Sequence, residues 1–174
     1  MALTMTVTAG GAVLHAVPAR AETTTQSAGR VTTTAVTTTA KKVRSAKAAK
    51  AARQASKARR AVVAARNQIG DPYRYGATGP GSFDCSGLVQ YAWRKAGVRL
   101  PRVASSQFAR IRHKVSWRNL KPGDLMFFNG LGHVGMYVGH GKMIHSPRTG
   151  ERVRVDRLGG WRKSSFVGAV RPGM

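Results

Sequence analysis

The hydrophobic and polar positions of this chain follow two different periods. Within residues 58–69 and again within 85–96 the apolar residues recur at every third or fourth position, which is the spacing of one helix face. From Leu125 onward the period becomes two, as in strands that bury only one face. Helices followed by a run of antiparallel strands predict an α+β domain.

The clearest helical pattern begins at the only cysteine of the chain. The small or apolar residues on its predicted face are Cys85, Leu88, Val89, Ala92 and Ala96. Gly97 would end this helix, and either Asp84 or Ser82 stands where an N-cap belongs. We therefore expect Cys85 in the first turn, where unpaired backbone N–H groups lower the pKa of a thiol. This stretch alone is equally compatible with a small buried side chain that has no chemical role.

Two further helices are expected, one before and one after the cysteine helix. The apolar residues of the first share one face: Ala61, Val62, Ala65 and Ile69. We expect the folded domain to start near Ala58 and this helix to end at the Gly-Asp-Pro sequence of residues 70–72. The other helix is expected at residues 105–111.

The second half of the chain predicts a meander of strands. We expect a buried strand at residues 125–128, followed by strands at 133–138, 143–145, 153–155 and 166–170. Gly139, His140 and Gly141 predict a three-residue turn in which Val138 pairs with Lys142.

That turn determines which side chains meet across the hairpin. If Val138 pairs with Lys142, residue 133 faces residue 147, and His145 is the diagonal neighbour of His133 on the same face. Two adjacent imidazoles and one thiol suit a cysteine hydrolase with Cys85 as nucleophile, His133 as base and His145 fixing the tautomer of His133. Metal binding is the weaker alternative, because the ligands are not closely spaced and the hairpin contains no acidic residue. We expect neither a metal nor a cofactor.

Composition adds a strong electrostatic constraint. The chain of 174 residues has 30 Lys and Arg against 6 Asp and Glu, a net charge of +24. Such a chain should bind polyanions such as nucleic acid, anionic wall polymers or a membrane surface. Its length suits one domain with attachments, and no apolar run is long enough to span a bilayer.

The residues before the domain divide into three segments. Residues 1–21 predict a secretory signal that ends in Ala-Arg-Ala, although no Lys or Arg precedes its apolar run and a disordered tail is the alternative. An unpaired cysteine in an exported chain would be a reactive thiol. Residues 22–40 form a Thr/Ala-rich linker.

Residues 41–57 form a basic arm, and its pattern of charges continues to residue 66. Residues 41–66 contain ten Lys or Arg and no acid, spaced among alanines. Because alanine favours a helix and like charges oppose it, we expect a partial helix that becomes firmer on a polyanion. Adhesion to the wall or to nucleic acid is the functional interpretation, and a solubilising arm is the alternative.

Six short motifs resemble, in order and spacing, those of the NlpC-type cell-wall peptidases. They are Pro-Tyr-Arg-Tyr-Gly at 72–76, Phe-Asp-Cys-Ser-Gly-Leu-Val at 83–89, Leu-Pro-Arg at 100–102, Pro-Gly-Asp-Leu at 122–125, Gly-His-Val-Gly-Met-Tyr-Val-Gly at 132–139 and Met-Ile-His at 143–145. The resemblance covers residues 58–172. It implies a papain-like α+β fold and a secreted, wall-associated bacterial enzyme that cleaves peptidoglycan stem peptides, often between D-γ-glutamate and the diamino acid.

The resemblance also implies roles for individual residues. Cys85 matches the nucleophile, His133 the base and His145 the third polar residue. Tyr73, or its neighbour Tyr75, matches a tyrosine at the oxyanion site, to which the backbone N–H of Cys85 would also donate. Asp84, Ser86 and Arg102 also match motif positions. We interpret Asp84 as a helix cap, Ser86 as part of the oxyanion and substrate site, and Arg102 as a group that binds substrate carboxylates.

The expected partners follow from these assignments. Stem peptides would be the substrate, anionic wall polymers would bind the basic arm, and we expect a monomer with no specific nucleic-acid partner. The alternative is a non-catalytic protein that binds polyanions or the cell wall on an inactive peptidase fold. The intact set of Cys85, His133 and His145 favours the enzyme, because a binding protein does not require it.

Overall fold

The structure is a computed structural model that describes residues 32–174, with side chains described from residue 40 onward except that of Trp161. The chain divides into residues 1–38 and residues 39–174, and the second unit holds every element that positions the site. The predicted signal at 1–21 and the first part of the predicted linker lie outside the described residues.

Helix α1 (Thr32–Arg66) is continuous through the basic arm. Residues 32–40, expected within a linker, are helical, and residues 41–66 form more than the partial helix expected, because alanines favour a helix throughout. Residues 40–53 are exposed, and packing begins at Gln54, whose Nε2 donates to the carbonyl of Pro172 at 3.1 Å.

The face of α1 that packs on the domain is made of small residues. Ala58, Ala61 and Ala65 are fully buried, as the predicted helical face requires. The prediction for Ile69 is wrong: the helix ends at Arg66, and Ile69 is 51% exposed. The chain then turns through Gly70, which has φ +97°.

Helices α2 (Cys85–Lys95) and α3 (Ala104–Arg110) match the two remaining predicted helices. Asp84 is the N-cap of α2, and Gly97 follows its C-terminus with φ +78°. Leu88, Val89 and Ala92 are fully buried against the sheet. The expectation of a cysteine at the start of a packed helix is confirmed.

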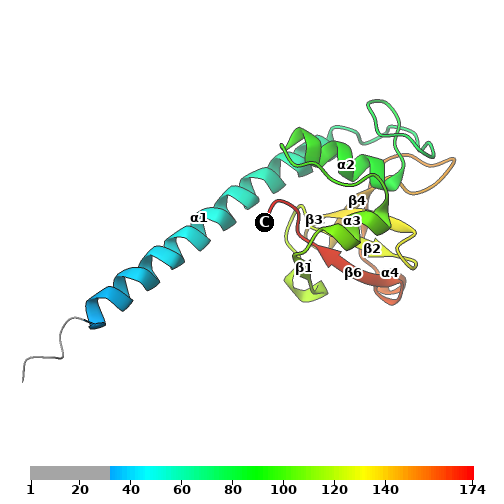
Figure 1. Cartoon of the computed structure of the whole chain (residues 1–174). Helices are drawn as coiled ribbons and strands as arrows, with labels where there is room; N and C mark the ends of the chain where they lie inside the picture. Colours follow the sequence, from blue (N-terminus) through cyan, green and yellow to red (C-terminus); the bar gives the residue numbers. More distant parts are fainter. Residues whose placement is uncertain (1–31) are drawn as a thin grey trace, which may run out of the picture. The chain divides into compact units, whose positions relative to one another are not determined.

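One six-stranded antiparallel sheet forms the rest of the domain, in the order β1-β6-β2-β3-β4-β5. Its strands are β1 (Lys114–Val115), β2 (Leu125–Phe128), β3 (His133–Gly139), β4 (Lys142–His145), β5 (Arg154–Arg157) and β6 (Phe166–Val170). The short helices η1 (Trp117–Asn119) and α4 (Gly160–Ser164) connect strands. The larger core lies between the sheet and α1, α2 and α3, and a smaller cluster around Met126, Phe128 and Met143 covers the other face (Figure 1). The α+β prediction is confirmed.

The β3–β4 hairpin has the predicted register but a different turn. Gly139 pairs with Lys142 across a two-residue turn, and a bulge at Val138 supplies the extra residue that the predicted three-residue turn would have contained. Beyond the bulge, Tyr137 pairs with Met143, which is the register that the predicted turn implies. His133 and His145 therefore lie on the same face, as expected.

Candidate active site

The backbone around Cys85 is fixed by its neighbour Asp84. The Oδ1 atom of Asp84 accepts the N–H of Gly87 at 2.7 Å, and its Oδ2 accepts the N–H of Gly76 at 2.9 Å. A Cβ on Gly87 would lie 2.1 Å from the carbonyl oxygen of Ala77, so this position requires glycine. The Asp-Cys-Ser-Gly sequence thus builds a tight cap that places Cys85 in the first turn of α2.

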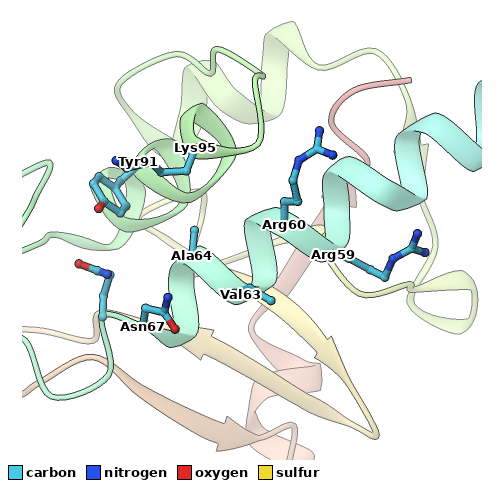
Figure 2. Close-up of a pocket in the computed structure, with 8 residues that line it drawn as sticks. Arg59, Arg60, Val63, Ala64, Asn67, Tyr91 and Lys95 are labelled. Atoms are coloured by element: carbon cyan, nitrogen blue, oxygen red, sulfur yellow. The ribbon is translucent and has the colours of Figure 1, made fainter.

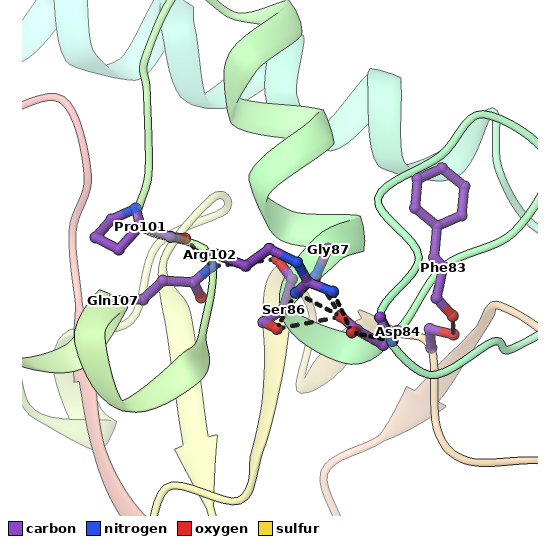
Figure 3. Close-up of polar contacts among 9 residues, drawn as sticks. Phe83, Asp84, Ser86, Gly87, Pro101, Arg102 and Gln107 are labelled. Atoms are coloured by element: carbon purple, nitrogen blue, oxygen red, sulfur yellow. Dashed lines mark hydrogen bonds and ion pairs between the residues drawn. The ribbon is translucent and has the colours of Figure 1, made fainter.

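Arg102 and Ser86 belong to the same polar network (Figure 3). The Arg102 guanidinium forms a two-pronged ion pair with Asp84, and its Nη1 donates to Ser86 Oγ at 2.9 Å. Ser86 Oγ donates to Asp84 Oδ1 at 3.1 Å. Burial alone would raise the pKa of Asp84, but the hydrogen bonds from Arg102 and Gly87 hold it below its ordinary value. The arginine expected to bind substrate carboxylates is therefore already paired with a carboxylate of the protein.

The thiol of Cys85 lies against the start of β3. Burial raises its pKa above the ordinary value, although the backbone N–H of Val134 and those of the helix start act in the opposite direction. The lowered pKa expected from the helix start is therefore wrong for the resting site, because desolvation outweighs the helix N–H groups. A thiol in this state needs a base at the moment of attack.

A hollow of about 360 Å³ opens over Cys85 and is lined by both candidate tyrosines, by Ser86 and by Arg102. Tyr75 is 88% exposed. Tyr73 is partly covered, and burial, together with the negative charge of Cys85 when it is a thiolate, raises its pKa. Tyr73 therefore lies near the thiol, whereas Ser86 is 6% exposed and is hydrogen-bonded to Asp84. The roles of Tyr73, Ser86 and Arg102 toward a substrate stay predictions.

The two histidines of the hairpin meet directly. His133 Nε2 and His145 Nδ1 are 2.8 Å apart. Burial lowers the pKa of each imidazole from 6.5 to about 4, and both are therefore neutral at neutral pH. A neighbouring hollow beside the two rings shares Gly132 with the hollow over Cys85. The nucleophile and the imidazole pair thus lie at adjoining parts of one surface.

Asp156 is the site residue that the sequence analysis missed. Its Oδ2 lies 2.9 Å from His145 Nε2 and 2.6 Å from the Nη2 of Arg162, and its Oδ1 accepts Arg154 Nε at 3.0 Å. Asp156 pairs with Met143 across β4 and β5, which places it on the face of His145. The alternation around Val155 was the available signal, but it required knowing that β5 pairs with β4.

A protein-family model decides the classification. The model described as the NlpC/P60 family matches residues 70–171, which is more than half of the chain. The chain belongs to the NlpC/P60 family. The expected family resemblance and the papain-like fold are confirmed.

Two named relatives of this NlpC/P60 chain are described as endopeptidases. It is 44% identical over 114 residues to murein DD-endopeptidase MepH of Escherichia coli, covering 60% of this chain and 42% of MepH. It is 41% identical over 107 residues to probable endopeptidase p60 of Listeria monocytogenes, covering 59% of this chain and 22% of p60. The match therefore spans less than half of either relative.

A solved structure has the same domain. The peptidoglycan hydrolase RipB of Mycobacterium tuberculosis superposes with a TM-score of 0.61 at 29% identity, covering 69% of this chain and 66% of that one. An NlpC/P60 family protein from Bacillus cereus superposes equally well, with a TM-score of 0.61 at 34% identity, covering 66% of this chain and 39% of that one.

Two further observations concern what this NlpC/P60 domain could bind. Within residues 32–174, no three His, Cys, Asp or Glu side chains are grouped so that they could hold a metal ion. The expectation of catalysis without a metal or cofactor stays a prediction. Among the described helices, none is long and apolar enough to cross a membrane.

Proposed function

We propose that this chain is a cysteine peptidase that hydrolyses peptide bonds in peptidoglycan stem peptides. The observation that carries the proposal is the contact of His133 with His145, with the thiol of the helix-start Cys85 against Val134 of the same strand β3, within an NlpC/P60 fold. The relatives named as murein endopeptidase and peptidoglycan hydrolase support the substrate class. The predicted signal at 1–21 and these relatives support action outside the cell, at the wall.

The geometry supports acyl transfer in two steps. As the sulfur of Cys85 attacks the carbonyl carbon, His133 takes the thiol proton, and the S–C bond forms. The backbone N–H of Cys85 and the hydroxyl of Tyr73 would bind the developing oxyanion. His133 then gives its proton to the leaving amine, and the C–N bond breaks to leave a thioester. Water attacks the thioester with His133 again as base, releasing the acid and restoring the thiol.

Two bonds in the stem peptide are candidates. The motif resemblance favours the bond between D-γ-glutamate and the diamino acid. The relative MepH is named a DD-endopeptidase, which favours a bond between two D-centres in a cross-link. We propose the first, and the masses of the released fragments distinguish the two.

The decisive experiment is a digest of purified peptidoglycan by the wild type and by Cys85→Ala, read by mass spectrometry. We expect new fragments from the wild type and none from Cys85→Ala, with the far-ultraviolet circular dichroism of the two proteins unchanged. Equal fragments from both proteins would exclude Cys85 as the nucleophile. Binding to walls without any cleavage by the wild type would favour the non-catalytic alternative, which the exposed basic helix supports.

We further propose that α1 binds anionic wall polymers. Its exposed basic residues between 40 and 53 have no acidic residue among them. At its packed end, Arg59 and Arg60 line a hollow of about 490 Å³ together with Lys95 of α2 (Figure 2). Cations in a row on one helix attract a polyanion through release of its counterions, so binding should weaken steeply with salt.

A pair of charge-matched variants tests the arm. One replaces Lys41, Lys42, Arg44, Lys47 and Lys50 with glutamine. The control replaces five exposed arginines of the domain that make no side-chain hydrogen bond or ion pair among the described residues: Arg99, Arg110, Arg112, Arg118 and Arg157. We expect only the first set to reduce sedimentation with purified walls and its salt dependence. An equal loss in both would show that net charge, and not the helix, determines binding.

A further inference from the structure

We propose that Asp156 is a positioning residue that, through His145, keeps the proton of His133 on Nε2 and leaves Nδ1 free to act as the base. The inference rests on the proposed function of His133. It adds a fourth group to the set of Cys85, His133 and His145, and it assigns a direction to every hydrogen bond in that set.

The first step is the unbroken row of contacts. Asp156 Oδ2 lies 2.9 Å from His145 Nε2, and His145 Nδ1 lies 2.8 Å from His133 Nε2. Both rings therefore use Nε2 toward the Asp156 end of this row, and the Nδ1 of His133 is the one ring nitrogen of the pair that takes no part in it. His145 is 2% exposed, so water cannot readily replace either of its partners.

The second step is that the position of each proton in this row follows from which of its atoms can donate a hydrogen bond. A carboxylate only accepts hydrogen bonds, so the proton of neutral His145 must lie on Nε2. Its Nδ1 is then bare and accepts the proton on His133 Nε2. The Nδ1 of His133 is bare in turn, and this is the state that can receive the proton of the Cys85 thiol.

The third step is that Asp156 must stay ionised for this order to hold. Burial would raise its pKa, but the hydrogen bonds from His145 and Arg154 hold the pKa below the ordinary value. Arg154 forms an ion pair with Oδ1, and Arg162, whose side chain is 7% exposed, forms a second one with Oδ2. At neutral pH the carboxylate is therefore anionic and accepts from three donors.

Arg162 also shows why the order depends on Asp156. Its guanidinium and His145 Nε2 both lie within hydrogen-bond distance of the same carboxylate oxygen. Without that oxygen, the guanidinium would favour a bare Nε2 on His145, because a cation prefers an acceptor to a donor. The proton of His145 would move to Nδ1, the proton of His133 would move to its own Nδ1, and the base would be blocked.

The test is the histidine tautomers of the full chain at pH 7, measured by ¹⁵N NMR of ¹⁵N-histidine protein. We expect His133 and His145 of the wild type to be almost entirely in the Nε2–H form. In Asp156→Ala and in Asp156→Asn, the Nδ1–H form should become the major one, and a hundredfold excess of that form would correspond to a difference of about 2.7 kcal/mol. The control, Glu151→Gln, removes a carboxylate that binds Arg148 and Arg154 but neither imidazole, and should keep the wild-type tautomers.

The outcomes separate this inference from the proposed function. If the tautomers of both Asp156 variants match the wild type, the inference is wrong whatever the activity. If Asp156→Ala does not fold, Asp156→Asn decides alone, since an amide keeps the shape of the side chain. If the wild type does not cleave peptidoglycan, the proposed function fails while the tautomer measurement still stands.

A kinetic measurement completes the test. On a soluble stem peptide, Asp156→Ala should lower kcat on the order of a hundredfold with little change in KM, because the variant loses the base form and keeps the binding surface. Alkylation of Cys85 at pH 7 should slow in the same variant. Unchanged kcat alongside shifted tautomers would show that Asp156 does not position the base.

Discussion

Asp84 and Asp156 are both carboxylates that form ion pairs with arginine, and they differ in the other groups that they bind. Asp84 forms an ion pair with Arg102 and also accepts hydrogen bonds from Ser86 and from backbone N–H groups. Asp156 forms ion pairs with Arg154 and Arg162 and also accepts a hydrogen bond from the buried imidazole of His145. The same ion-pair chemistry therefore fixes backbone geometry around the nucleophile and fixes proton positions around the base.

The largest expected effect lies on the imidazole side. His133→Ala should lower kcat by about 10²–10⁴-fold with little change in KM, because it removes proton transfer from the transition state. His145→Ala should retain more activity, since it removes orientation only. Steady-state kinetics on a soluble stem peptide measures both, with the exposed His113→Ala as control. If His145→Ala were the less active variant, the roles of base and orienting group would have to be exchanged.

On the nucleophile side the expected effect is structural. Asp84→Ala removes the cap of α2 and leaves Arg102 without its carboxylate, so the free energy of unfolding should fall by about 2–4 kcal/mol. Urea denaturation measures it, with Asp71→Ala as the control. A loss below about 0.5 kcal/mol, within the range of ordinary surface substitutions, would contradict a structural role for Asp84.

The two sides also differ in how far the sequence could predict them. The Cys85 side is local: Asp84, Cys85 and Gly87 lie within one helix start, so spacing and capping rules suffice. The pairing of His133 with His145 is nearly local, because one hairpin register determines it. Asp156 depends on the pairing of β5 with β4, and the raised pKa of Cys85 depends on burial by the whole fold. Neither is contained in a local pattern.

The unfolding free energy should depend on pH in different ranges for the histidine pair and for Asp84. Folding lowers the pKa of His133 and His145 from 6.5 to about 4, so the unfolded chain binds more protons in this window. The unfolding free energy should therefore fall as the pH drops from 6.5 to 4, by up to about 1.4 kcal/mol per pH unit for each histidine. The lowered pKa of Asp84 contributes stability that is lost only below about pH 4.

Denaturation of the wild type and of His145→Gln at pH 7, 6 and 5 measures the histidine window. The variant should lose less stability on acidification than the wild type, because one titrating imidazole is absent. Parallel curves for the two proteins would show that His145 is not buried as a neutral group in the folded state.

The smallest expected effect concerns the resting thiol. Because burial raises the pKa of Cys85, its alkylation by iodoacetamide should keep rising above pH 8.5, the ordinary midpoint of a free thiol. A plateau already reached below pH 7 would show a resting thiolate paired with a protonated His133. In that case the description of Cys85 and His133 as neutral in the resting site would be wrong.

The central claim is that Cys85 carries the acyl group of a cleaved stem peptide. Intact-protein mass spectrometry after acid quenching of a reaction with soluble stem peptide tests it most directly. We predict an acyl adduct that maps to Cys85 in the wild type and is absent from Cys85→Ala, which should also release no product. Product release by Cys85→Ala at the wild-type rate would contradict the claim.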